Sequence, residues 1–76
     1  MNKELFLALY KAIKEAYDPK ILYIIIDILQ EAGYGHYHSY RTGECYDRDV
    51  ETVNDTEYGD FLVGYAREIQ SYRFDA

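Results

Sequence analysis

The stretch DPKILYIIIDILQEAG, residues 18–33, begins and ends with helix signals. Asp18 can cap a helix, Pro19 suits the first helical position, where its missing N–H is not needed, and Gly33 is typical of the residue just past a helix end. The many isoleucines would also suit a buried strand, but they show no period-two alternation, and the polar residues fall on one helical face. We therefore predict a helix, and its apolar residues on nearly three sides place it at the centre of the fold.

A helix is also predicted before this stretch, over residues 3–17, with Asn2 as its cap. Its apolar residues recur at helical spacing and form a stripe of small and aliphatic side chains: Leu5, Ala8, Leu9, Ala12, Ile13 and Ala16. A second stripe lies beside the first and makes the apolar face wide: Phe6, Tyr10, Ile13 and Tyr17. The broad face predicts burial against other helices.

A third helix is predicted over residues 55–72, where Asn54 and Glu57 fit a capping box. An apolar stripe follows at helical spacing: Tyr58, Phe61, Leu62, Tyr65, Ile69 and Tyr72. Gly59 and Gly64 would weaken this helix by ~1 kcal/mol each relative to alanine. Their missing side chains would let another backbone approach closely.

About twenty residues separate the second and third helices, too many for a structureless connection in a chain of 76 residues. Tyrosines favour strands and Thr42-Gly43 suits a turn, so we predict a β-hairpin that pairs residues 36–41 with 44–50. The fold class expected is α+β, one domain over residues 1–76 with the order ααββα, and the alternative is all-α. A two-residue turn would set His36 and His38 opposite aspartates, whereas a three-residue turn would set them opposite Tyr46 and Arg48.

The net charge of −6 belongs to one segment, residues 44–60. This segment holds seven carboxylates and a single basic residue, Arg48; the carboxylates are Glu44, Asp47, Asp49, Glu51, Asp55, Glu57 and Asp60. Such a field repels nucleic acid and attracts basic surfaces. We therefore expect no direct binding to DNA or RNA, and a basic protein surface as the partner.

Ten tyrosines and no tryptophan exceed what so small a core can bury with every hydroxyl satisfied. Exposed tyrosines beside carboxylates are typical of protein-binding surfaces. The partner-binding residues predicted on this basis are Tyr37, Tyr40, Glu44, Tyr46, Asp47, Asp49, Glu51, Asp55, Glu57 and Asp60. On a strand, alternate carboxylates would stand about 6.6 Å apart, against one phosphate per ~3.4 Å along each DNA strand. The mimicry of DNA would be approximate.

In size, acidity and tyrosine content the chain resembles the small inhibitors that phages and mobile elements encode against host nucleic-acid enzymes, such as anti-CRISPR and anti-restriction proteins. The resemblance is one of type and assigns no functional residue. It implies an inhibitor without enzymatic activity or cofactor that occupies the basic, nucleic-acid-binding surface of a host enzyme complex. Because Cys45 is the only cysteine, no intramolecular disulfide forms, and the host cytoplasm is the expected location.

Two other functions fit parts of the sequence. His36, His38 and Asp47 could bind zinc or another transition metal, because alternate strand residues project side by side. Histidines that merely pair with acids on a half-exposed strand are the favoured interpretation, so no metal site is assigned. The broad apolar faces of the first two helices would suit a structural subunit that forms a homo-oligomer, such as a homodimer.

Overall fold

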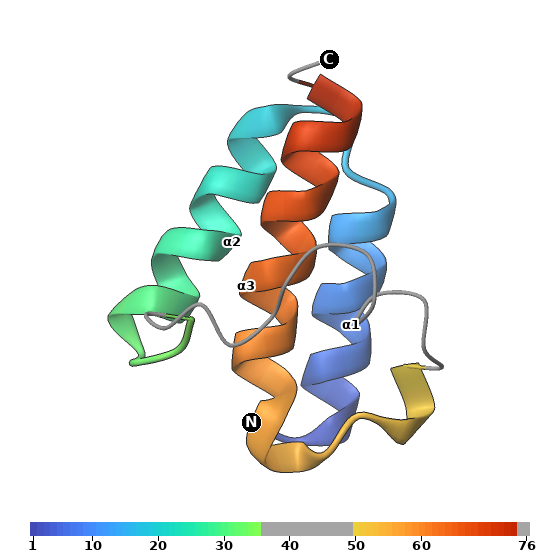
Figure 1. The fold of residues 1–76 in the computed structure, drawn as a ribbon, viewed down its shortest axis with the longest axis vertical. Helices are drawn as coiled ribbons and strands as arrows, with labels where there is room; N and C mark the ends of the chain where they lie inside the picture. Colours follow the sequence, from blue (N-terminus) through green and yellow to red (C-terminus); the bar gives the residue numbers. More distant parts are fainter. Residues whose placement is uncertain (36–49, 75–76) are drawn as a thin grey trace.

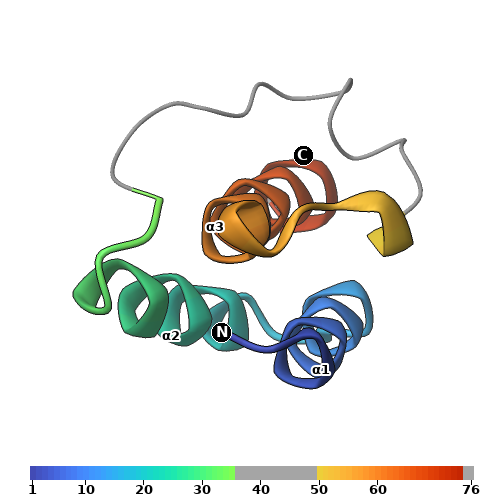
Figure 2. The same cartoon turned by 90° about the horizontal axis from the view of Figure 1, so that it is seen from below.

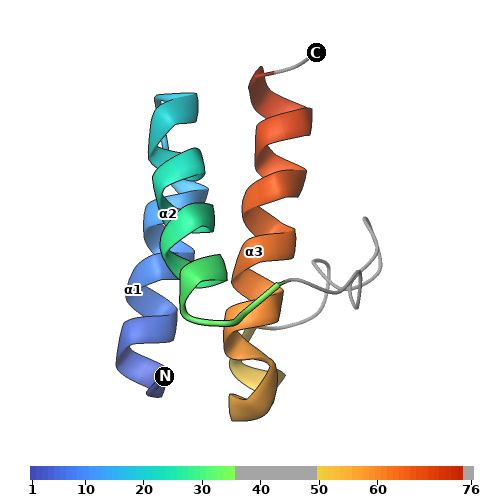
Figure 3. The ribbon, with the colours of Figure 1, turned by 90° about the vertical axis from the view of Figure 1, so that its left-hand side faces the viewer.

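The fold is built from three α-helices and three short helical segments, and the computed structural model describes residues 1–35 and 50–74. Their order is α1 (Lys3–Lys14), α2 (Pro19–Glu31), the 3-10 helices η1 (Val50–Thr52) and η2 (Asp55–Glu57), α3 (Tyr58–Ile69) and the π-helical segment η3 (Gln70–Phe74) (Figure 1). α1 and α2 run side by side in opposite directions and form one layer. α3 packs over one side of that layer (Figures 2 and 3).

The prediction of an α+β fold was wrong. The described part of the chain, residues 1–35 and 50–74, contains helices and no strand, so it belongs to the all-α class. Val50, expected to end the second hairpin strand, begins η1 instead, and its carbonyl accepts a hydrogen bond from the N–H of Val53 at 3.2 Å. Residues 36–49, which include the other positions of the predicted hairpin, lie outside the described residues. Among the described residues, three helices bury the hydrophobic core against one another, so no sheet is needed to cover it.

The predicted starts of α1 and α2 are confirmed. Oδ1 of Asn2 accepts a hydrogen bond from the N–H of Leu5 at 2.8 Å, and Oδ1 of Asp18 accepts one from the N–H of Lys20 at 2.9 Å. Pro19 occupies the first position of α2, as predicted. Each cap satisfies a backbone N–H that has no partner within its helix.

The predicted end of α2 at Gly33 is also confirmed. Gly33 has a φ of 98°, a left-handed conformation that costs glycine no Cβ clash. Its N–H donates to the carbonyl of Gln30, and the N–H of Tyr34 donates to the carbonyl of Leu29, both at 3.0 Å. These two bonds are the Schellman arrangement, and they direct Tyr34 toward the start of α3.

The capping box predicted at Asn54 does not form. The Asn54 side chain makes no capping hydrogen bond, and the N–H of Glu57 donates to the Asn54 backbone carbonyl at 2.9 Å instead. This i→i+3 bond is that of a 3-10 turn, so η2 precedes the α-helical part of the predicted helix.

α3 is the central helix, which corrects the expectation that the isoleucine-rich helix would be. It packs closely against both α1 and α2, whereas α1 and α2 touch one another only slightly. Its buried side covers most of its circumference: Tyr58, Gly59, Phe61, Leu62, Val63, Tyr65, Ala66 and Ile69. Among the described helices, α3 alone packs closely against two others, so it buries the widest face.

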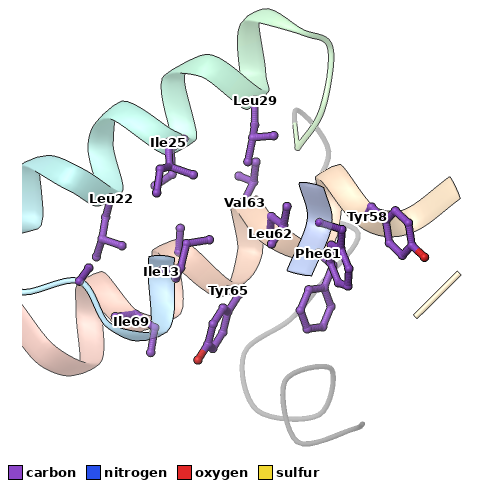
Figure 4. Close-up of a cluster of buried hydrophobic side chains, with 14 of the residues drawn as sticks. Ile13, Leu22, Ile25, Leu29, Tyr58, Phe61, Leu62, Val63, Tyr65 and Ile69 are labelled. Atoms are coloured by element: carbon purple, nitrogen blue, oxygen red, sulfur yellow. The ribbon is translucent and has the colours of Figure 1, made fainter. Parts of the chain in front are cut away.

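The two interfaces of α3 differ in chemistry. Against α1 the contact is aromatic: Phe6 stacks on Tyr58 with ring centroids 4.1 Å apart, and Tyr10 stacks on Tyr65 at 4.9 Å. Against α2 it is aliphatic, and Figure 4 shows Leu29 pointing toward Val63. Stacked aromatic pairs contribute about 0.5–1.5 kcal/mol beyond the burial of their area. The α1–α3 contact therefore depends on specific ring geometry.

Two of the apolar stripes read from the sequence are only partly buried. In α1 the buried residues are Phe6 and Ile13, while the small-residue stripe turns partly outward and leaves Leu5 49% exposed. At the other end, Tyr72 is 77% exposed and Phe74 packs against the core instead. The i→i+5 turns of η3 are wider than α-helical turns, so they change the phase at which side chains return to the core.

Candidate functional site

The acidic residues predicted to bind a partner divide into described and undescribed groups. Four of them are described: Glu51 in η1, Asp55 and Glu57 in η2, and Asp60 in the first turn of α3. The other predicted partner-binding residues lie outside the described residues: Tyr37, Tyr40, Glu44, Tyr46, Asp47 and Asp49. The candidate site is therefore built from the four described carboxylates.

Glu51 and Asp55 are exposed on the two short turns that precede α3, and Glu57 beside them is half-buried. We name η1 and η2 with these three carboxylates the acidic turns. The strand spacing proposed for Glu51 does not apply, because this residue belongs to a 3-10 helix. The rise in a 3-10 helix is about 2.0 Å per residue, so Asp55 and Glu57, which share η2, are closer along the helix axis than alternate residues of a strand.

Glu51 is paired within the molecule. Its Oε2 lies 2.7 Å from Nζ of Lys3, and about half of each side chain is exposed. An exposed ion pair of this kind contributes about 0–1 kcal/mol because water and salt screen it. The pair places η1 beside the start of α1, and it remains open to exchange for a charge on a partner.

Asp60 has a structural role that the sequence analysis missed. Its Oδ1 accepts a 2.6 Å hydrogen bond from the N–H of Gly35, 25 positions earlier in the chain. The contact is partly buried and joins the segment after α2 to the first turn of α3. Among the described acidic residues, Asp60 is therefore the weakest candidate for contact with a partner.

Two glycines allow the segment after α2 to lie against α3. A Cβ on Gly59 would fall within 3.0 Å of the ring of Tyr34, and a Cβ on Gly35 would fall 2.6 Å from side-chain atoms of Val63. Gly35 also has a positive φ of 71°. The close approach predicted for Gly59 occurs, but its neighbour is an aromatic ring and not a backbone. Tyr34 itself is half-buried there.

Tyr65 is a buried tyrosine of α3 whose surroundings shift its pKa. Burial, the nearby Tyr10 and a hydrogen bond with its side chain raise the pKa of Tyr65 to about 12, although Arg73 acts in the opposite direction. The tyrosine is therefore neutral at physiological pH. Its place in the aromatic α1–α3 contact gives it a packing role.

The residues of the metal alternative, His36, His38 and Asp47, lie outside the described residues. Within residues 1–35 and 50–74, no three side chains of the metal-binding types come together. The same part of the chain holds no helix with the length and apolar character that a membrane span requires.

The homo-oligomer alternative named the broad apolar faces of the first two helices, and the structure shows which residues of α2 are exposed. Ile24 is 57% exposed and Ile28 is 61% exposed, and both lie on the side of α2 turned away from its buried Leu22 and Leu29. The signal was visible in residues 18–33, whose apolar residues cover more sides than two neighbouring helices can bury. That excess leads to two predictions: a central position in the fold and, together with the first helix, a homo-oligomer.

The geometry thus shows two surfaces, the acidic turns and the exposed face of α2. The chain was compared with protein-family models, with curated proteins and with solved structures, and no match was found in any of the three.

Proposed function

We propose that this chain is a non-enzymatic, protein-binding inhibitor that occupies a basic, nucleic-acid-binding surface of another protein. The observation that carries the proposal is the exposure of Glu51 and Asp55 on the acidic turns, within the segment that holds the entire net charge. Carboxylates gathered on one surface attract a basic groove and repel nucleic acid. The inhibitor would therefore compete with the nucleic acid for that groove.

The finer parts of this proposal come from the resemblance in size, acidity and tyrosine content. They are an inhibitor of the phage anti-defence type, such as an anti-CRISPR or anti-restriction protein, and action in the cytoplasm of the host cell. The partner would be one component of a nucleic-acid-processing complex. Its affinity should fall steeply with salt, because screening weakens attraction between exposed charges.

A purely structural explanation of the same carboxylates sets the design of the test. Asp55 and Glu57 stand before the first turn of α3, where negative charge stabilises a helix by about 0.3–1 kcal/mol. Replacing them by lysine would therefore weaken the fold as well as the surface. Amide replacements are preferable, because they remove charge while keeping a similar shape and hydrogen-bonding ability.

The test uses the double variant Glu51→Gln/Asp55→Asn and a matched control, Glu15→Gln/Asp27→Asn. Each removes two exposed carboxylates and changes the net charge from −6 to −4, but the control leaves the acidic turns intact. Tagged wild-type protein is used to capture its partner from an extract of the candidate host cells. Affinity for the purified partner is then measured by calorimetry at two salt concentrations and with competing DNA.

We expect the wild type and the control to bind the partner, with affinity lowered by salt and by DNA. The acidic-turn variant should bind at least tenfold more weakly at low salt. A captured partner with no basic surface, or equal affinity of the two double variants, would contradict the proposal. Far-UV circular dichroism of all three proteins shows whether the fold is kept.

A further inference from the structure

The exposed face of α2 is formed by three isoleucines at helical spacing, and we name it the isoleucine face. Ile24 and Ile28 are each more than half exposed and lie one turn apart, and Ile21, one turn earlier on the same side, is half-buried. Isoleucine loses side-chain freedom in a helix, so nothing local favours it at exposed helical positions. A row of such residues in water is typical of a surface that another molecule covers.

The charges beside the isoleucine face suit a second copy of the same chain. Lys20 lies at the start of α2 and Glu31 at its end, and at 100° per residue both project from the same side of the helix, next to Ile24. In an antiparallel pair about a two-fold axis, Ile24 of one copy packs against Ile28 of the other. Lys20 of each copy then comes close to Glu31 of the other, so the Lys20–Glu31 pair occurs twice in the interface.

The local charge also favours a second copy over a basic partner. Residues 1–32 carry a net charge of only −1, from four lysines (Lys3, Lys11, Lys14, Lys20) and five acids (Glu4, Glu15, Asp18, Asp27, Glu31). Two copies can therefore approach through α2 without strong repulsion. A basic protein has little electrostatic reason to select this face.

α1, the neighbouring helix in the same layer (Figure 2), also exposes apolar side chains. Leu5 is 49% exposed, and Ala8 and Ala12, which lie on the same side of α1, are exposed as well. Small side chains let a second helix approach closely. The layer of α1 and α2 thus offers more contact area than α2 alone. A stable dimer requires such a larger area.

From these observations we infer that the chain forms a two-fold symmetric homodimer through the isoleucine face of α2. The inference is independent of the proposed inhibitor function, because η1 lies beside α1 and α3, away from α2 (Figure 2). A dimer assembled in this way would leave the acidic turns of both copies accessible. It would present two acidic surfaces to its partners.

The test measures the mass of the full chain in solution by sedimentation equilibrium over a dilution series. The wild type should have twice the mass of 9.0 kDa at high concentration and dissociate on dilution. Ile24→Lys/Ile28→Lys should be a monomer over the whole series, with an unchanged far-UV circular dichroism spectrum. The matched control is Tyr23→Lys, which changes a 55% exposed apolar residue on another side of α2 and should keep the dimer.

A charge-swap series tests the antiparallel arrangement without touching the isoleucines. Lys20→Glu and Glu31→Lys should each weaken dimerisation by about tenfold, since each places like charges together at both ends of the interface. The double variant Lys20→Glu/Glu31→Lys should restore it. A monomeric wild type, a dimer that survives both lysine substitutions, or weakening in the double variant as great as the sum of the single effects would each overturn the inference.

Discussion

The backbone N–H of Gly35 donates a hydrogen bond to Oδ1 of Asp60, and this contact joins the turn after α2 to the start of α3. In the sequence, Asp60 is one of seven neighbouring carboxylates, and nothing distinguishes it from the others as a predicted partner-binding residue. The structure separates them, because a carboxylate that accepts a partly buried backbone hydrogen bond is held by the fold. Exposed carboxylates such as Asp55 remain candidates for contact with a partner.

Replacing Asp60 by alanine should destabilise the protein by about 1–3 kcal/mol, because the N–H of Gly35 loses its acceptor in a partly buried place. Asp60→Asn keeps an oxygen acceptor and should cost less. Urea denaturation measures both, and Asp55→Ala is the control with the same change of charge near the same helix end. Equal stability of the two alanine variants would show that the hydrogen bond contributes little.

Gly59→Ala should destabilise the protein by about 1–3 kcal/mol, although alanine is the better helix former. The reason is the ring of Tyr34, which occupies the space that the new methyl group needs. In a Tyr34→Ala background the same change should be neutral or stabilising. A double-mutant cycle by denaturant unfolding checks this coupling, and an identical cost in both backgrounds would refute the proposed clash.

Arg73 should matter through its donor geometry more than through its charge. Its Nη1 donates to the carbonyls of Lys14 at 3.0 Å and Ala16 at 2.9 Å, and so ties η3 to the end of α1. Arg73→Lys should therefore lower the free energy of unfolding by about 0.5–1.5 kcal/mol. Arg67→Lys, the same change at an exposed position of α3, is the control in thermal denaturation. A loss at position 73 no larger than at position 67 would argue against this role.

The stability of the protein should decrease as the pH rises from about 10 to about 12. The unfolded chain loses the Tyr65 proton near the ordinary tyrosine pKa of about 10, whereas burial and the neighbouring Tyr10 raise the pKa of Tyr65 to about 12 in the folded state. The folded state thus binds more protons in this window, so its stabilisation is complete below pH ~10 and is lost above it. Denaturation at pH 9 and pH 11 measures the effect.

Two phenylalanine variants separate Tyr65 from the other groups that titrate in alkali. Tyr65→Phe should reduce the loss of stability between the two pH values, because it removes the perturbed hydroxyl. Tyr17→Phe changes a tyrosine that is 85% exposed and should leave the loss as it is in the wild type. The same pH dependence in all three proteins would mean that Tyr65 does not cause it.

The helix ends show which caps can be predicted from the local sequence. Asn2, Asp18 and Gly33 act as predicted, because a cap depends on backbone groups within two or three residues. Asn54 does not act as predicted. The N–H of Glu57, which its side chain would have accepted in a capping box, donates to its backbone carbonyl instead. The sequence motif was present, but a competing local geometry prevailed.

The candidate surfaces were less predictable than the helices. The acidic segment follows from composition, although its 3-10 turns do not, and Glu51 and Asp55 within it are exposed. Asp60 could not be distinguished from them, because its partner Gly35 is remote in the sequence. The residues of the isoleucine face could not be identified from the sequence for a similar reason. Periodicity shows which sides of a helix are apolar, but it does not show which of these sides packs against another helix.

The sequence alone determined where the three helices lie and where α1 and α2 begin, because capping and periodicity act over a few residues. Only the tertiary structure decided which apolar side chains are buried: Ile25 and Ile26 face the core, whereas the chemically identical Ile24 and Ile28 face water. Burial depends on where another helix passes. In this protein α3 packs on one side of α2 (Figure 2), and Ile24 and Ile28 of the isoleucine face lie on another side and are exposed.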